Sequence, residues 1–172
     1  MLSPNRARWR ALAVDWRVGR GESIEQRCKC ERGEAPWASI ADSFTPDAVF
    51  IDPGFGRVEG RDEMARFFDW SIIGLDGWEF PEQWTMADGD RVVSFWWNRV
   101  PGTRDDGTPH QAPAMSILHY AGDGKFDYEL DLMNIVEVTE VLAAAEWTPG
   151  EGMTFPGPDP DRDPTPPRLS TP

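Results

Sequence analysis

One stretch, residues 45–68 with the sequence TPDAVFIDPGFGRVEGRDEMARFF, constrains the fold more than any other part of the chain. A short apolar strand, Ala48 to Ile51, ends on Asp52 directly before a proline, and a Gly-rich loop follows. A helix is then predicted from Arg61, with an apolar face at the i, i+3, i+4 spacing formed by Met64, Phe67 and Phe68. This order of strand, loop and helix predicts a pocket that holds one well-placed acid.

The second half of the chain is rich in β-branched and aromatic residues separated by tight turns. Asp-Gly turns at residues 88–89 and 123–124 predict antiparallel hairpins. An exposed loop is predicted over residues 101–109. The strands themselves are predicted at Glu82 to Ala87, Arg91 to Val100, Ala112 to Tyr120 and Lys125 to Met133.

Helices are predicted before and after these strands from apolar positions spaced three and four apart. The first runs to about Val18 and is interrupted by Gly19 and Gly21. The others are predicted at about Ile24 to Glu31, Trp37 to Phe44, Arg61 to Gly74, and from Asn134, as the N-cap, to about Ala145.

This order of elements predicts an α+β fold in which a cone-shaped, curved antiparallel sheet wraps the N-terminal helices and leaves a pocket. We expect one domain over residues 1–148. Residues 149–172 form a separate tail that contains eight of the sixteen prolines. Such a segment buries too little apolar surface to offset its ordering entropy, so it is predicted to be disordered, or at most draped over the surface.

Charge and composition narrow the function classes. The net charge is −13, with eight basic against five acidic residues in positions 1–35 and nine against twenty-five in the remainder. A protein this acidic repels the phosphate backbone of nucleic acids, so we expect no nucleic-acid partner. No apolar run approaches the roughly 20 residues of a membrane span. The first residues lack the apolar core of a signal peptide, so no membrane partner and a cytoplasmic location are expected.

The motif DAVFIDPGFG, followed by EGRDEM and the late strand pair around YAGDGKF, resembles the nuclear-transport-factor-2-like superfamily. Within it, residues 37–134 are most similar to the SnoaL-like polyketide cyclases and the ketosteroid isomerases. The resemblance implies the cone-shaped fold, also known as cystatin-like, and a homodimer formed through the outer sheet face. It implies no cofactor and no metal, because an acid of this kind needs none.

The resemblance also implies roles for individual residues. In ketosteroid isomerases, the aspartate at the position of Asp52 is the general base. Their first-helix tyrosine has no counterpart here, and their acid on the penultimate strand falls on Ser116. SnoaL-like cyclases use an acid at a position like that of Asp131, with a histidine where Ser116 stands. The Arg-x-Asp of epoxide hydrolases of this fold is also missing, since the nearest strand reads WWNR.

The residues themselves leave alternatives open. Desolvation next to Phe50 would raise the pKa of Asp52 and make it a usable base, whereas Asp before such a loop also commonly caps a turn. Strict alternation places Asp131 with Asp127 and Glu129 on one strand face, opposite the apolar residues. Only a bulge, strong curvature or an open pocket on that face would bring Asp131 inside.

We therefore expect a pocket for an apolar, carbonyl-bearing small molecule of steroid, polyketide or terpenoid type. Asp52 and Asp131 are the candidate catalytic residues of an isomerase or cyclase. The alternative is a non-catalytic ligand-binding or dimeric assembly module of the same fold. The candidate ligand-binding residues are Ser116, Asn98, Trp96, Phe50, Phe67 and Leu118.

Overall fold

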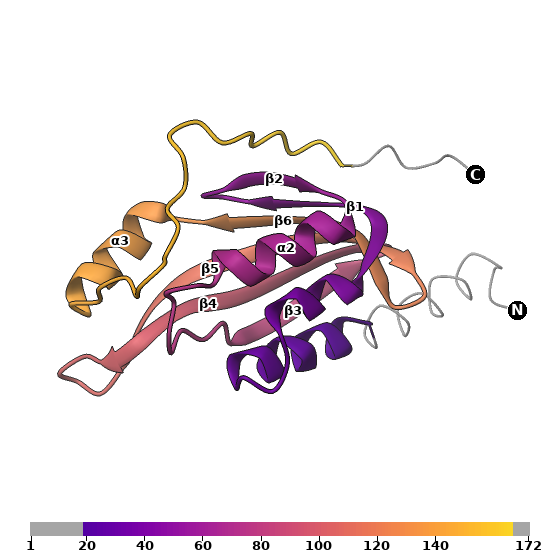
Figure 1. Ribbon diagram of the computed structural model, residues 1–172. Coiled ribbons are helices and arrows are strands. Elements are labelled where there is room, and N and C mark those ends of the chain that lie inside the picture. Colours follow the sequence, from indigo (N-terminus) through magenta and orange to yellow (C-terminus); the bar gives the residue numbers. More distant parts are fainter. Residues whose placement is uncertain (1–18, 167–172) are drawn as a thin grey trace, which may run out of the picture.

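The computed structural model of the chain describes residues 19–166, which form a mixed α+β fold around one curved sheet (Figure 1). In chain order the elements are a helix over residues 19–31, the 3₁₀ helix η1 (Trp37–Ser43), β1 (Phe44–Asp52), β2 (Gly56–Glu59), α2 (Arg61–Ser71), β3 (Glu82–Asp88), β4 (Arg91–Thr103), β5 (Pro109–Gly122), β6 (Lys125–Met133) and α3 (Ile135–Ala144).

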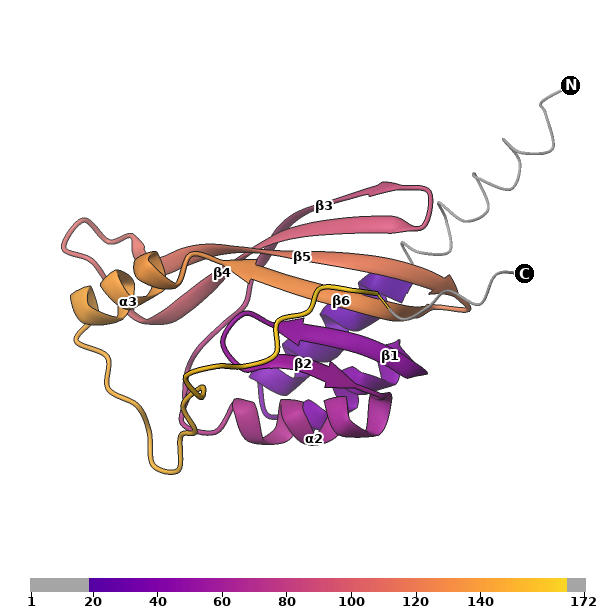
Figure 2. The same ribbon diagram turned by 90° about the horizontal axis from the view of Figure 1, so that it is seen from above.

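The six strands form a single sheet in the order β2-β1-β6-β5-β4-β3. β1 runs parallel to β6, and all other neighbours are antiparallel. The helix over residues 19–31, η1 and α2 cover one face of this sheet, and α3 lies at one end of it (Figure 2). The predicted α+β class and the curved sheet wrapped on N-terminal helices are confirmed.

The core lies between the covered face of the sheet and α2. It is built from alternate residues of the strands and from the apolar face of α2, which contributes Met64 and Phe67. Alternation is clearest in β4 and β5, where every second side chain is buried. The fully buried side chains with the largest volumes include Phe44, Phe126 and Ile51.

The helix over residues 19–31 corrects one prediction, because Gly19 and Gly21 do not interrupt it. At Gly19 the reason is packing. A Cβ there would lie 2.9 Å from the Cα of Gly124 in the β5–β6 turn, so only a glycine lets helix and turn approach this closely. The helix predicted before Val18 lies outside the described residues.

The Gly-rich loop after Asp52 was predicted to be irregular, but it contains β2, which pairs with β1 as a short hairpin. β1 begins at Phe44, four residues before the predicted strand, and its pairing with β6 changes register between Phe44 and Val49. Asn134 caps α3 as predicted, since its side chain accepts hydrogen bonds from the backbone N–H groups of Val136 and Glu137.

Residues 149–166 contain no helix or strand and run across the surface beside β2 (Figure 1). Of the two predicted alternatives, these residues are draped over the surface. Backbone and side-chain hydrogen bonds connect them to the folded body. Residues 167–172 lie outside the described part. No helix within residues 19–166 is long and apolar enough to cross a membrane.

Candidate functional site

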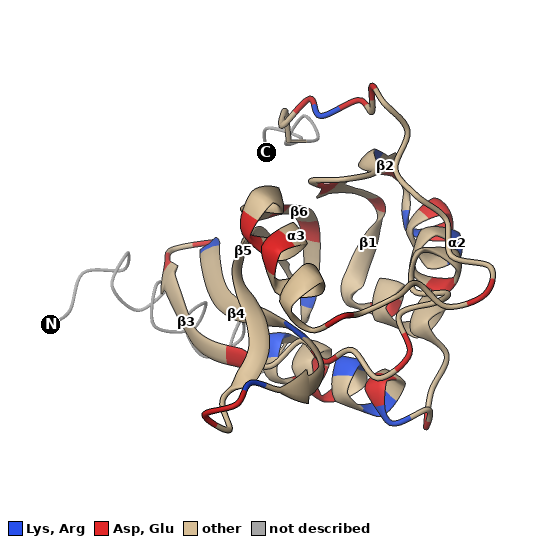
Figure 3. Ribbon diagram, turned by 90° about the vertical axis from the view of Figure 1, so that its left-hand side faces the viewer, with Lys and Arg blue, Asp and Glu red and all other residues tan. Residues whose placement is uncertain are grey.

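A cavity of about 340 Å³ lies between the covered face of the sheet and the helices. Figure 3 looks toward the end of the molecule where α3 lies between the long strands on one side and β1 with α2 on the other. Most of the wall is apolar and aromatic. These residues include Phe50, Phe55, Phe67, Phe68, Trp37, Trp78, Phe80, Trp96, Ile135, Val138 and Leu142.

A row of polar side chains crosses the covered face of the sheet. In the strand registers, Ser94 of β4 is paired with Ser116 of β5, and Ser116 with Asp131 of β6. Ile51 of β1 is paired with Leu130 of the parallel strand β6, so the next residue of each strand, Asp52 and Asp131, lies at the same level of the sheet. The row therefore brings two carboxyl groups from neighbouring strands onto one wall of the cavity.

Asp52 combines the two roles that the sequence left open. Its Oδ1 accepts hydrogen bonds from the backbone N–H groups of Gly54, at 2.7 Å, and Phe55, at 2.8 Å, which fixes the turn after β1. The side chain also lines the cavity. Burial raises the pKa of Asp52, although both N–H donors and Arg162 oppose this effect. Asp52 is therefore a turn cap that also lines the cavity as a partly desolvated carboxylate.

A bulge in β6 decides which way Asp131 points. His119 is paired with Tyr128, but the next residue, Tyr120, is paired with Phe126, so Asp127 is an extra residue in the ladder. Beyond the bulge, Glu129 and Asp131 line the cavity, while Tyr128 packs in a separate cluster with Val49 and Ile51. Phe126 lies in the main core. The strict alternation considered for this strand is therefore broken at Asp127.

Glu129 and Asp131 form a buried pair of carboxyl groups. Burial raises the pKa of Asp131 well above its ordinary value, and the neighbouring charge of Glu129 raises it further. Burial also raises the pKa of Glu129, opposed chiefly by the charges of Arg20 and Arg27. Because two adjacent carboxylates repel, the pair favours holding a proton.

Ser116 connects Asp131 to β4. Its hydroxyl donates to Asp131 Oδ1 at 2.5 Å, and the indole Nε1 of Trp96 donates to Ser116 Oγ at 3.0 Å. Trp96 and Ser116 are both buried. These hydrogen bonds fix Oδ1 of Asp131, and they leave its other carboxyl oxygen, Oδ2, available to the cavity.

Two arginines of the helix over residues 19–31 form a second polar region of the wall. Arg20 is held by three hydrogen bonds: its guanidinium donates to Glu82 Oε2 at 2.7 and 3.1 Å and to Ser94 Oγ at 2.9 Å. Burial alone would raise the pKa of Glu82, but Arg20, Thr85 and Ser94 outweigh it and the pKa is lowered. Arg27 lines the same cavity one to two turns further along the helix.

Seven of the eight residues predicted for the site line this cavity: Asp52, Asp131, Ser116, Asn98, Trp96, Phe50 and Phe67. Leu118 does not, because it is buried in the core cluster two residues along β5 from Ser116. Sequence reasoning missed Arg20, Arg27 and Glu129. A polar stripe at i, i+3, i+7 (Arg20, Ser23, Arg27) was the available signal for the helix.

Comparison with known families decides the relationship. The family model of the SnoaL-like domain matches residues 32–129, which is more than half of the chain. The chain belongs to the SnoaL-like family. The matched residues of this SnoaL-like domain include Asp52, Ser116 and Glu129 but stop before Asp131 and the C-terminal segment.

Solved structures share the fold of this SnoaL-like domain. A SnoaL-like polyketide cyclase from Jannaschia sp. CCS1 is 18% identical, with a TM-score of 0.54 over 74% of this chain and 93% of that one. An LEH-like epoxide hydrolase of M. tuberculosis is 16% identical, with a TM-score of 0.54 over 73% and 90%. The epoxide hydrolase/cyclase-like enzyme SalBIII is 19% identical, with a TM-score of 0.55 over 72% and 95%. At these identities the likeness establishes the fold. No curated protein matches this chain.

No group of three or more His, Cys, Asp or Glu side chains within residues 19–166 is arranged to hold a metal ion. What the cavity wall offers is acid–base chemistry from Asp52, Glu129 and Asp131 and hydrogen bonding from its serines and arginines.

Proposed function

We propose that the cavity binds an apolar, carbonyl-bearing small molecule of steroid, polyketide or terpenoid type and catalyses proton transfer next to the carbonyl. The outcome would be an isomerisation or a cyclisation that needs no cofactor. The observation that carries this proposal is the placement of Asp52 beside the Glu129–Asp131 pair on one wall of a mostly apolar cavity.

Asp52 is the proposed base. Within the described residues, its recorded hydrogen bonds all reach Oδ1, so Oδ2 is left for a substrate proton. A base is most effective when its pKa lies near the working pH, and burial moves the pKa of Asp52 in that direction.

Asp131 is the proposed acid. A carboxyl group kept neutral by its surroundings can donate a hydrogen bond to a carbonyl oxygen and stabilise the enolate that forms when the base removes a proton. The chain has serine where ketosteroid isomerases carry their acid, and Asp131 is paired with that serine in the neighbouring strand. On this proposal the acid lies on β6, one strand away from its position in the ketosteroid isomerases, and the bulge at Asp127 turns its side chain toward the cavity.

The rival function is a binding or assembly module without chemistry, because the same carboxyl groups could serve only to fix the turn and the sheet. Deuterium incorporation distinguishes the two. In D₂O, the wild-type protein is incubated with a panel of steroid and aromatic ketones, and exchange at the carbon next to the carbonyl is followed by NMR. Catalysed exchange supports the enzyme. Binding of several ketones without exchange above the buffer rate supports the module.

A homodimer formed through the outer sheet face remains our proposal, and the aromatic residues there support it. Trp84 stacks on Phe95 with ring centroids 5.4 Å apart, Phe95 contacts Trp97, and Trp84 and Met86 are 42% and 62% exposed. We expect light scattering at micromolar concentration to give the mass of a dimer, and Trp84→Glu to shift it toward monomer because a charge would be buried. A wild-type protein that is only monomeric would contradict the dimer.

A further inference from the structure

The C-terminal segment, residues 149–166, lies beyond the part of the chain that matches the family, yet hydrogen bonds hold it to the folded body at several points. The backbone N–H of Arg57 in β2 donates to the carbonyl of Asp161 at 2.7 Å, and the Arg57 guanidinium donates to the carbonyls of residues 163 and 165. Tyr128 Oη donates to the carbonyl of Pro164 at 2.7 Å. Arg162 in turn donates to the carbonyl of Pro53 at 2.9 Å.

Three glycines of the folded body leave room for this segment. A Cβ added at Gly56 would lie 2.4 Å from the carbonyl oxygen of Asp161, and one at Gly74 would lie 2.7 Å from Met153 Cβ. A Cβ at Gly54 would lie 3.0 Å from Pro156 Cγ. Because any side chain at the first two positions would displace the segment, the Gly-rich loop after Asp52 is also a docking groove for the C-terminal segment.

The docked segment reaches the cavity. Met153 and Pro156 both line it, beside Gly54 and the turn that Asp52 caps. We propose that the C-terminal segment is a fixed wall of the cavity that sets the size of ligand the protein accepts, with Met153 as the specificity-determining residue. This goes beyond the proposed function, since it applies to any ligand of the cavity and requires no catalysis.

Docking is tested by limited trypsin digestion of the full chain, with the cut after Arg162 followed by mass spectrometry. Tyr128→Phe removes one hydrogen bond and little else, so cleavage is expected to rise roughly threefold to tenfold. Gly56→Ala adds the Cβ that meets Asp161 and is expected to raise cleavage further. Gly107→Ala is the matched control, because its φ is also positive (83°) but nothing lies within 4 Å of the added Cβ. Equal cleavage in all four proteins would overturn the docking.

Ligand size is tested with two ketones, 2-acetylnaphthalene and the larger androstenedione, by titrating the tryptophan fluorescence of the cavity. Met153→Ala is expected to improve the affinity for the larger ketone relative to the smaller one by roughly tenfold, since it removes apolar wall. Phe155→Ala is the control, because Phe155 lies on the same segment, 65% exposed and away from the cavity. An unchanged ratio in Met153→Ala, or the same change in both variants, would overturn the proposal.

A second observation concerns Arg27, which lines the cavity but makes no hydrogen bond within the described residues. Its Nε is buried without a hydrogen-bond partner, and its recorded ion pair is a 3.5 Å contact with Glu31 Oε1 one turn along the helix. Arg20, by contrast, is held by Glu82 and Ser94. Burial and the charge of Arg20 lower the pKa of Arg27, and the charge of Glu31 opposes them.

From this orphaned donor we infer that Arg27 binds an oxyanion, a carboxylate or a sulfonate, carried by the apolar ligand. The inference deepens the proposed function and rests on its cavity. Glu129 faces the same region, and its repulsion of a bound anion is reduced because Glu129 and Asp131 favour holding a proton between them. A guanidinium is suited to this task because its planar fork matches the geometry of such groups.

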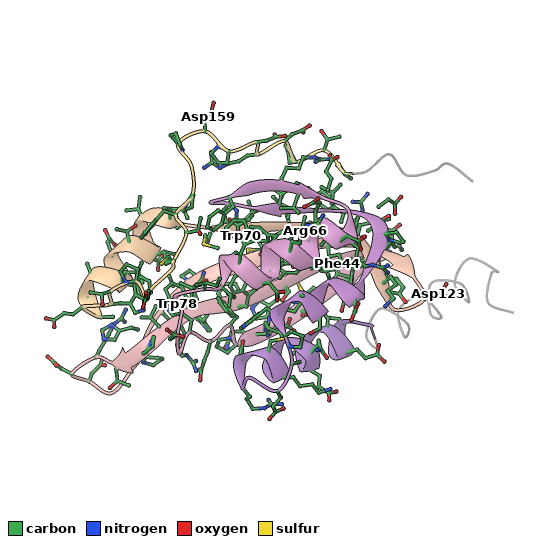
Figure 4. The ribbon with its side chains drawn as sticks, in the orientation of Figure 1. Phe44, Arg66, Trp70, Trp78, Asp123 and Asp159 are labelled. Carbon is green, nitrogen blue, oxygen red and sulfur yellow. The ribbon has the colours of Figure 1, made fainter. Side chains whose placement is uncertain are left out.

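Two fluorescent probes that differ by a single group test this inference, 8-anilinonaphthalene-1-sulfonate and the neutral N-phenyl-1-naphthylamine. Wild type is expected to bind the sulfonate about tenfold to a hundredfold more tightly than the neutral probe. Arg27→Met should remove that preference. Arg66→Met, on α2 and outside the cavity (Figure 4), makes the same change in net charge and should retain it.

The wild-type comparison is decisive even if Arg27→Met does not fold. Equal affinity for the two probes would overturn the role of Arg27 while leaving the proposed proton transfer intact. A preference for the sulfonate that survives in Arg27→Met would overturn it as well. Binding of neither probe would contradict the ligand cavity itself, and with it both the inference and the proposed function.

Discussion

Asp52→Asn is expected to lower ketone proton exchange by about 10²–10⁴-fold, the usual contribution of a general base, while ligand affinity changes little. The substitution keeps the shape of the side chain. The amide oxygen can still accept the N–H groups of Gly54 and Phe55 that Oδ1 accepts now, so the turn after β1 is retained. What disappears is the ability to take a proton. The measurement is the rate of deuterium exchange at the α-carbon, with tryptophan fluorescence titration for affinity.

Asp47→Asn is the matched control, because Asp47 lies on the same strand but is exposed and does not line the cavity. It should exchange and bind as wild type does. If Asp52→Asn kept most of the exchange rate, Asp52 would serve only as a turn cap and the base would have to be sought elsewhere on the wall. If it lost binding and exchange together, its role would be architectural.

The fold was largely predictable because the strands carry their own signals. In β4 the alternation of buried and exposed residues is regular, and the Asp-Gly turns joining β3 to β4 and β5 to β6 are local chemistry. The error at Gly19 and Gly21 has a different origin. Glycine has a low helix propensity, but here the close approach of Gly19 to Gly124 requires a glycine at that position of the helix. A rule based on local sequence cannot include this contact, because it joins residues more than a hundred positions apart.

The site was predictable only in part, for a related reason. Asp52 could be found because its position before Pro53 is a local pattern, and Ser116 because the family resemblance places the penultimate-strand acid of the isomerases at that position. The inward position of Asp131 depends on the bulge at Asp127, which the pairing with β5 creates. Arg27 belongs to a polar stripe of its helix that could have been read from periodicity, whereas the wall contributed by Met153 depends on packing between segments distant in sequence and could not.

The buried pair of carboxyl groups also predicts how stability responds to pH. The pKa values of Asp131, Glu129 and Asp52 are all raised in the folded protein, chiefly by burial. At a pH above the ordinary value of these groups, the unfolded chain has released protons that the folded chain still holds. The free energy of unfolding therefore falls as pH rises from about 4 toward and through the folded pKa values, and the contribution is fully present only below the ordinary value.

Asp131→Asn isolates this effect, because the amide carries no charge at any of these pH values and can still accept the hydrogen bond from Ser116. We therefore expect the stability of the variant relative to wild type to rise between pH 4 and pH 8, because the raised pKa of Asp131 destabilises only the wild type as pH increases. Urea denaturation at pH 4, 6 and 8 measures it. Glu82, whose lowered pKa has the opposite effect, is present in both proteins and cancels in this difference.

Asp159→Asn makes the same chemical change at an exposed position of the C-terminal segment (Figure 4) and should leave the pH dependence of wild type unchanged. If Asp131→Asn had the same slope as wild type, Asp131 would be ionised in the folded protein and could not serve as the proposed acid. If the slope is lost and the variant is more stable at pH 8 but inactive in proton exchange, the same burial that destabilises the fold is what keeps Asp131 able to donate. In that outcome, the stability that the fold loses to this acid would follow from its proposed role, as expected where an active site limits stability.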